Sequence, residues 1–547
     1  MTGPDDDIAR RVTNAEIVQF PRAVNSALHV SEGGGAADRA ARAQDGQFGD
    51  SAPSLSTGRG DDDDEPPRSF DDYVERMNRE WAFVLMGSRA VAIREQADAP
   101  IEDRTRVVSL EALKAYFKNV TWRVKSREKN DDGQWVERWK NANAATKWLS
   151  SPLRRTYDGI EFWPDRENAP GTKGYFNLWR GFSFAPSQVE ARERRALYSV
   201  FEDHLRTNIA NGNEAHYRWL WHWFASIVQR PRERTGTAVV LRGKMGTGKT
   251  VLGEVIGSLF ASHYFLVDDP RYLTGQFNAH MASCLLLQVD EGFWAGDKAA
   301  EGRLKGLVTA RTQMIESKGV DPIRLTNYVR LLFSSNESWV VPAGMEERRF
   351  AVFDVGDAAR QNHSYFDELY KQLGNGGREA LLADLLSVDL DAADAPDVRV
   401  IPKTEALLEQ KLRSLDPVQS WFFERLMNGS PTRRAQSWPS HPFPIVTLLN
   451  DYMRAAERIG VKRRSDETQF AYAMKRLLPD LRAAVKRRCE IDVLGEYGKW
   501  TKEIRRVRCW ELGSLQAARD AFEEAVCQTI EWPAEEEAHH DGEDVTI

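Results

Sequence analysis

Cysteine is scarce in this sequence and never closely paired. The 547 residues include only four cysteines, Cys284, Cys489, Cys509 and Cys527, at widely separated positions. This spacing excludes a disulfide framework and a zinc site built from Cys-x-x-Cys pairs, and it is typical of a reducing cytosol. The sequence also lacks an apolar run of the roughly 20 residues that a membrane-spanning helix needs, and a basic-then-apolar leader at its start. We therefore expect a soluble cytoplasmic protein without a membrane partner.

Large apolar residues are rare at both ends of the chain, where acidic residues dominate. The first 67 residues include a triple glycine and the acidic run from Asp61 to Glu65, and the last residues are similarly acidic. Segments of this composition cannot bury enough surface to fold, so we expect disordered acidic tails at 1–67 and 531–547. Each tail is either a solvated charge run, a mimic of nucleic acid or a docking segment for a partner.

The sequence between the tails is rich enough in apolar residues to fold. The whole chain is 41% hydrophobic and 10% aromatic, with a formal net charge of -7. Its length suits roughly two to four domains.

One Gly-rich segment has the pattern of a Walker A phosphate-binding loop. It follows the apolar run 238–241 and precedes a helical pattern that begins at Val251. A strand that leads through glycines into a helix N-terminus points backbone N–H groups at one spot, which suits the phosphates of ATP. We expect Lys249 to reach the β- and γ-phosphates and the Thr250 hydroxyl to bind Mg²⁺. The loop consists of Gly243, Lys244, Met245, Gly246, Thr247, Gly248, Lys249 and Thr250.

Two further apolar strands end in residues suited to ATP hydrolysis. The run from Cys284 to Val289 ends in Asp290 and Glu291, the pattern of a Walker B strand. Asp290 is expected to hold the Mg²⁺ shell and Glu291 to polarise the attacking water. A later apolar run ends in Asn336, which either senses the γ-phosphate or simply ends the strand and starts a turn.

Two basic features lie near these strands. Arg348 and Arg349 precede the apolar run 351–353, and either could reach the γ-phosphate of a neighbouring subunit in a ring. A surface charge cluster is the alternative. Lys318 lies in a turn, expected over residues 318–322, between two β-like runs. We expect this hairpin lysine to contact DNA, although an exposed turn lysine is more often only solvated.

The remaining segments give a predicted domain order. The alternation of strands and helices in the ATPase core predicts an α/β fold, a parallel sheet with helices on both faces. Its ligand is expected at the carboxyl ends of the strands. The expected parts are a small α+β domain at 68–186, a helical collar at 187–234, an ATPase core at 235–357, a helical connector at 358–430 and a winged-helix-like basic domain at 431–530.

The small domain and the collar carry several local signals. A helix is expected from Phe70 to Arg79, then a hairpin over 81–93, and then a helix that Ser109 caps. Basic and aromatic residues alternate from 120 to 155, which serves either a nucleic-acid surface or a solvated rim. The collar is expected to contain two long helices, 187–209 and 214–228, the second with an apolar stripe that belongs to the core.

The C-terminal region combines a distinctive element order with many basic residues. Helices are expected over 404–412, 417–426, 444–459 and 466–478, followed by β-like runs around 485–491 and 505–510. Helix, helix, hairpin is the order of a winged-helix module. Clustered lysines and arginines favour DNA binding there, with an ordinary charged surface as the alternative.

The motif order resembles that of the superfamily 3 helicases of viruses, phages and plasmids, and most of all the helicase part of phage primase-helicases. The similarity rests on the motif residues above and on the segments 273–280, 290–298 and 335–343. The resemblance implies an AAA+-like P-loop NTPase that assembles as a homo-oligomer, a hexameric ring. It further implies hydrolysis of ATP at subunit interfaces and translocation on single-stranded DNA at a replication fork.

The resemblance also implies a phage or plasmid gene expressed in the cytoplasm of a bacterial host. We expect no priming activity, because no adjacent-strand carboxylates of a primase site are evident, so a separate primase or polymerase would be a partner. Two other functions remain open. The first is a DNA-binding replication initiator or loader without processive unwinding, and the second, more distant, is a small-molecule P-loop kinase.

Overall fold

The computed structural model describes residues 67–131, 133–275, 278–291, 298–317, 320–494 and 500–534. The predicted acidic tails therefore fall almost entirely outside the described residues, and so does Lys318. Within the described parts, no helix has the length and apolar character needed to cross a membrane.

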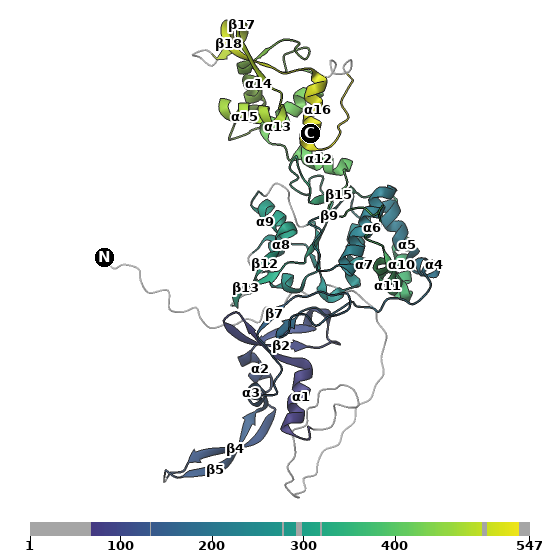
Figure 1. The fold of residues 1–547 in the computed structure, drawn as a ribbon, viewed down its shortest axis with the longest axis vertical. Helices are drawn as coiled ribbons and strands as arrows, with labels where there is room; N and C mark the ends of the chain where they lie inside the picture. Colours follow the sequence, from purple (N-terminus) through teal and green to yellow (C-terminus); the bar gives the residue numbers. More distant parts are fainter. Residues whose placement is uncertain are drawn as a thin grey trace, which may run out of the picture. The chain divides into compact units, whose positions relative to one another are not determined.

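The ATPase core is built on a five-stranded parallel sheet (Figure 1). The strands are nearly continuous apolar runs because both faces of the sheet are covered, as in parallel sheets generally. The predicted α/β fold with a parallel sheet is thus confirmed. In spatial order the strands are β10 (Tyr264–Val267), β11 (Leu286–Asp290), β14 (Arg330–Ser335), β9 (Ala238–Arg242) and β15 (Phe350–Asp354).

This strand order determines where the sequence motifs meet. The Walker A loop follows β9, the Asp290–Glu291 pair ends β11, and Asn336 follows β14, which lies between those two strands. Because all these strands are parallel, their carboxyl ends share one edge of the sheet. Helix α7 (Lys249–Ser258) leaves the Walker A loop and packs against β10, β11 and β14. Other core helices are α8 (Pro270–Thr274) and α9 (Lys298–Thr309), with 3₁₀ turns at Ala261–His263 and Ala279–Ser283.

An antiparallel hairpin is inserted between β11 and β14. Its strands are β12 (Thr312–Ser317) and β13 (Val320–Thr326), so the predicted hairpin is confirmed. The expected turn over residues 318–322 was too long, because β13 already includes Asp321 and Pro322. Pairing of Ser317 with Val320 leaves room for only two residues between the strands.

The helical collar differs from its prediction in the first segment. The expected helix 187–209 is instead broken into α4 (Ala191–Arg194), a 3₁₀ turn (Arg195–Tyr198), α5 (Ser199–Asp203) and a π-helix, η3 (His204–Ile209). Side chains of the π-helix bond to the Walker A loop and to the start of the connector at Ala359, and such long-range contacts override a regular local helix. The second helix is confirmed as α6 (Glu214–Gln229), and its aromatic stripe lies in the core.

The N-terminal domain has a four-stranded sheet in the order β3-β2-β1-β6. Its own core includes Tyr73, Trp81 and Trp148. The predicted first helix, hairpin and Ser109 cap are confirmed. The elements are α1 (Phe70–Glu80), β1 (Trp81–Met86), β2 (Arg89–Glu95), a 3₁₀ turn (Ile101–Asp103), β3 (Thr105–Ser109), α2 (Leu110–Tyr116), β4 (Thr121–Lys129), β5 (Trp135–Asn143), α3 (Ala144–Leu149), β6 (Thr156–Tyr157), β7 (Gly159–Glu161) and β8 (Tyr175–Asn177).

The C-terminal region forms a separate apolar core around Trp421, Tyr452, Phe470 and Trp510. Its helices match the predicted ones closely, whereas its two strands are much longer than expected. A three-stranded antiparallel sheet has the order β16-β18-β17. The elements after the ATPase core are α10 (His363–Gln372), a π turn (Leu373–Gly377), α11 (Arg378–Ser387), α12 (Glu405–Arg413), α13 (Pro417–Met427), β16 (Phe443–Pro444), α14 (Ile445–Arg458), α15 (Glu467–Leu477), β17 (Arg482–Leu494), β18 (Trp500–Glu511) and α16 (Leu515–Val526).

Candidate nucleotide site

The Walker A loop has the backbone geometry of an anion cradle. Gly246 and Gly248 have φ angles of +80° and +85°, which residues with a side chain rarely adopt. A Cβ atom on Gly248 would lie 2.6 Å from the ring of His204 and 2.7 Å from that of Phe366. Gly248 also caps α7 without a side-chain hydrogen bond, so the first-turn N–H groups of this helix are available to an anion.

Lys249 links this loop to the end of β14. Its Nζ donates to Oδ1 of Asn336 at 2.8 Å and to the carbonyl oxygens of Gly243 at 2.9 Å and Lys244 at 2.8 Å. The residue is only 5% exposed. Burial lowers the pKa of its ammonium group, while the carboxylates of Asp290 and Glu291 act in the opposite direction.

The two expected Mg²⁺ ligands are in direct contact. The Thr250 hydroxyl donates to Oδ2 of Asp290 at 2.9 Å, and the Ser334 hydroxyl donates to Oδ1 at 2.6 Å. A hydroxyl and a carboxylate oxygen are donors that suit Mg²⁺, so these residues fit the ion. Ser334 was missed in the sequence, although it lies in the polar end of the same strand that leads to Asn336.

Glu291 and Asn336 form the remaining pair. Nδ2 of Asn336 donates to Oε1 of Glu291, so one amide contacts both Lys249 and Glu291. The backbone of Glu291 is left-handed, with φ of 51°, a conformation that costs a non-glycine residue free energy. The structure therefore brings together five residues singled out in the sequence: Lys249, Thr250, Asp290, Glu291 and Asn336.

A second layer of residues supports the loop from behind, and the sequence did not single out any of its side chains. The buried His204 ring bonds through Nε2 to the carbonyl oxygen of Gly248 at 3.1 Å. Burial lowers the pKa of His204, and the loop carbonyl partly opposes that effect. The N–H of Gln361 donates to the carbonyl oxygen of Gly246 at 3.0 Å. No short motif signals these contacts, because they join segments far apart in the chain.

Arg348 and Arg349 lie away from this cluster. They directly precede β15, whose first residue, Phe350, pairs with the first residue of β9. They are therefore at the amino-terminal edge of the sheet, about 16 Å of strand from the edge that carries the nucleotide motifs. Glu347 accepts the backbone N–H groups of both arginines and lies 3.7 Å from the Arg349 guanidinium.

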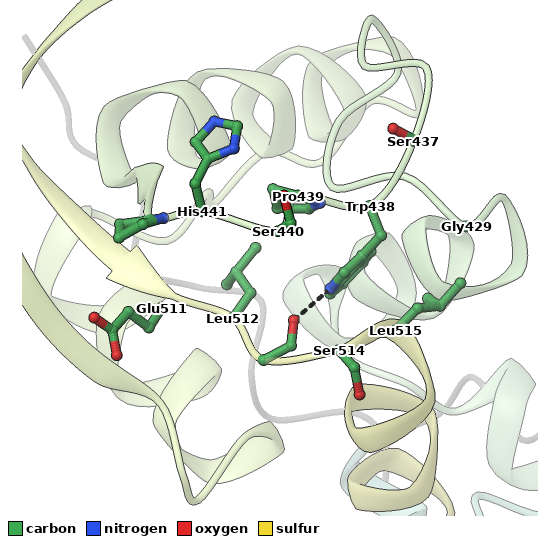
Figure 2. Close-up of a pocket in the computed structure, with 12 residues that line it drawn as sticks. Gly429, Ser437, Trp438, Pro439, Ser440, His441, Glu511, Leu512, Ser514 and Leu515 are labelled. Carbon is green, nitrogen blue, oxygen red and sulfur yellow. Dashed lines mark hydrogen bonds between the residues drawn. The ribbon is translucent and has the colours of Figure 1, made fainter.

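A hollow elsewhere in the described part of the chain contains none of these residues. It encloses about 690 Å³ in the C-terminal region, beside Trp438, Leu512 and Leu515. Figure 2 shows the Trp438 indole donating to the carbonyl oxygen of Gly513, at 3.0 Å, across this hollow. The N-terminus of α16 lines it through Ser514 and Leu515, but no lysine or arginine does, so the motif cluster remains the candidate nucleotide site.

Comparison with known proteins places the similarity over the same region. A family model described as a family of unknown function (DUF5906) matches residues 241–349. The DNA primase-polymerase of Nitratiruptor phage NrS-1 is 26% identical over 219 residues, which are 38% of this chain and 30% of that protein. This match therefore spans less than a third of the relative's length.

Solved structures of that relative extend the comparison to the fold. An apo structure of the NrS-1 C-terminal region, in its A form, covers 81% of this chain and 98% of its own, with a TM-score of 0.51 and 15% identity. Another apo structure of the region covers 80% and 98%, with a TM-score of 0.49 and 15% identity. The chain is thus related to the NrS-1 phage primase-polymerase and resembles its C-terminal region in fold.

Proposed function

We propose that this chain is an ATP-driven DNA helicase of the superfamily 3 type that acts in phage replication. The observation that carries the proposal is the meeting of Lys249, Thr250, Asp290, Glu291 and Asn336 at one edge of the parallel sheet. A small-molecule kinase would not need the Lys249–Asn336–Glu291 connection. The relationship to a phage primase-polymerase supports the replication context.

The residues divide the work of hydrolysis among themselves. The Walker A loop and α7 hold the phosphates, and Lys249 neutralises their charge. Thr250 and Asp290 would hold Mg²⁺, which would supply charge stabilisation during phosphoryl transfer. Glu291 orients and polarises the attacking water, and Asn336 holds the Glu291 carboxylate in place through its amide.

The two arginines extend the site to a neighbouring subunit. Since they lie at the opposite edge of the sheet from the motifs, they cannot serve the nucleotide of their own subunit. In a ring, one of them would reach the γ-phosphate held by the next subunit and stabilise charge there. We infer a homo-oligomeric ring, a hexamer by resemblance, with Lys318 of the β12–β13 hairpin contacting single-stranded DNA.

The decisive experiment compares Lys249→Ala with the intact chain. We expect single-stranded DNA to stimulate ATP hydrolysis in the intact protein, and Lys249→Ala to abolish both hydrolysis and strand separation. Lys371→Ala is a suitable control, because Lys371 is an exposed lysine of α10 that pairs with Glu368. Unwinding that persists in Lys249→Ala would overturn the proposal.

A DNA-binding initiator or loader is the second candidate. Its support is the C-terminal order α13, β16, α14, α15, β17, β18 with sheet order β16-β18-β17, an arrangement that resembles a winged-helix module. Exposed cations on the β17–β18 hairpin, such as Arg487 and Arg506, suit duplex phosphates. Lys318→Ala separates the candidates, since loss of unwinding with intact ATPase supports translocation and no effect of the substitution supports loading. The proposal includes no primer synthesis, which a separate primase or polymerase would supply.

A further inference from the structure

Strands β4 and β5 form a ribbon of their own in the N-terminal domain. They pair over their full length as a two-stranded antiparallel sheet and share no pairing with the four-stranded sheet beside them (Figure 1). Trp122, near the start of β4, packs against Phe70 and Tyr73 of the domain core, but a ribbon of only two strands has no core of its own. The residues that the ribbon exposes are therefore free to serve another purpose.

The register of the ribbon collects cations on one face. Directly opposed residues of an antiparallel pair lie on the same face, and successive residues alternate between faces. The pairs Arg123–Asn141, Lys125–Trp139, Arg127–Glu137 and Lys129–Trp135 therefore share one face, which we call the basic ribbon face. All eight of these residues are exposed, and they include four cations and one carboxylate, Glu137, which lies 3.5 Å from Lys125 and 3.8 Å from Arg127.

Two tryptophans stand among these cations. Trp135 is 65% exposed and Trp139 is 58% exposed, values that no packing role explains. The Lys129 ammonium lies 5.5 Å from the centre of the Trp135 ring, and the Lys125 ammonium lies 5.6 Å from that of Trp139. Four residues of strand place the two rings about 13 Å apart on the same face. Each ring is thus held beside a cation with much of its surface open to solvent.

We propose that the basic ribbon face binds single-stranded nucleic acid. Bases stack on exposed indole rings, and lysine or arginine beside each ring neutralises the adjoining phosphate. Paired bases inside a duplex do not offer their faces to such rings, which favours a single strand. A second copy of this chain is a poor occupant for the same face, because four cations would meet four others. The proposal does not depend on ATP hydrolysis and adds a contact outside the motor.

The test measures binding of a fluorescein-labelled oligothymidylate to the full chain by fluorescence anisotropy, without nucleotide. Lys318→Ala serves as the background, so that the hairpin of the motor does not contribute. We expect Trp135→Ala with Trp139→Ala to weaken binding about 10-fold to 100-fold. The corresponding double phenylalanine variant should retain most of the affinity, because it keeps two stacking surfaces.

A matched pair of charge variants controls for general electrostatics. Arg127 lies on the basic ribbon face, and Arg138, which is also exposed, lies on the opposite face. Arg127→Gln should weaken binding and reduce the slope of log affinity against log salt by about 0.7. Arg138→Gln should leave that slope nearly unchanged. ATP hydrolysis in the absence of DNA should be the same in each ribbon variant as in its Lys318→Ala parent, so a failure here is distinct from a failure of the motor.

Three outcomes would overturn the proposal. In the first, the double alanine variant binds oligothymidylate as tightly as its parent does, and its circular dichroism shows that it is folded like the intact chain. The second is equal loss of affinity for a labelled duplex of the same length, which would indicate phosphate contact without stacking. The third is unchanged affinity together with a smaller sedimentation coefficient, which would identify the face as a contact between copies.

Discussion

Arg348 and Arg349 are adjacent in sequence but differ in their surroundings. Arg348 is exposed, and within the described parts of the chain its guanidinium has no hydrogen bond or ion pair. Arg349 is partly buried beside the Glu347 carboxylate, at 3.7 Å. A side chain that acts on another subunit has to be free to extend. We therefore infer that Arg348 is the residue that reaches the neighbouring nucleotide and that Arg349 fixes the segment.

This inference predicts a specific result when variants are mixed. Arg348→Ala should lower ATP hydrolysis about 10³-fold or more, the range for arginines that act on a transferring phosphoryl group. Mixing Arg348→Ala with Lys249→Ala should restore part of the activity, because some interfaces then combine an intact Walker A loop with an intact Arg348. Activity should be assayed against the mixing ratio. Full activity of Arg348→Ala, with loss in a folded Arg349→Ala variant, would reverse the assignment.

Single residues also show which parts of the candidate site could be predicted from the sequence and which could not. Lys249, Asp290, Glu291 and Asn336 were identifiable because each follows an apolar strand at a recognisable motif. Ser334, by contrast, contacts Asp290 through a strand pairing, and nothing in its local sequence distinguishes it from Ser335. The motif residues can be read from the chain, but the residues that orient them cannot.

At the scale of elements, the strands of the core and most helices could be predicted from local sequence patterns. Their apolar runs and caps are short-range signals, as in α13 and α15, each of which begins with an aspartate capping box. The π-helix η3 was not foreseeable in this way. Its geometry depends on contacts of His204 and Asn208 with Gly248 and Ala359, which the fold brings together from distant parts of the chain.

One 3₁₀ turn of the core contacts the segment before the collar through a buried histidine. The ring of His263 stacks on Trp179, with centroids 4.5 Å apart. Its Nδ1 donates to the carbonyl oxygen of Ser283, and its Nε2 accepts the N–H of Arg180, both at 2.8 Å. Burial lowers the pKa of His263 from 6.5 to about 3. The bond that Nε2 accepts requires the neutral ring, whereas the Nδ1 donation persists when the ring is protonated.

This contact predicts a loss of stability in mild acid. Because the folded-state pKa lies below the unfolded value, the unfolded chain takes up a proton first as the pH falls. The contribution of His263 is complete above pH 6.5 and declines toward pH 3. The free energy of unfolding should fall by about 1 kcal/mol per pH unit within that window. Glutamine cannot titrate, so the free energy of unfolding of His263→Gln, measured with urea, should depend less on pH in this window. A pH dependence equal to that of the intact chain would contradict the assignment.

At the scale of the whole molecule, the two halves of the proposed active site lie at opposite edges of one sheet. The nucleotide motifs occupy the carboxyl edge, and Arg348 and Arg349 occupy the amino edge. Under the proposed function, a single subunit therefore cannot complete its own site. A ring is the simplest assembly in which every subunit receives an arginine and provides one.

This arrangement predicts that hydrolysis depends on protein concentration. The rate of ATP hydrolysis per subunit should fall on dilution, in parallel with the molar mass measured by light scattering. An Arg348→Ala variant should show a low rate at every concentration, because its assembled interfaces are also incomplete. A rate per subunit that stays constant through dissociation into monomers would contradict the need for a ring.

The left-handed backbone of Glu291 has a further consequence for how such proteins diverge. Glycine would adopt that conformation without strain, so Glu291→Gly would favour the folded state by roughly 1 kcal/mol while removing the carboxylate. Stability and hydrolysis therefore place opposite demands on this one position. In a lineage that kept the fold but no longer needed the chemistry, selection to keep glutamate would relax. Glycine at position 291 would then identify relatives that keep the fold but no longer hydrolyse ATP.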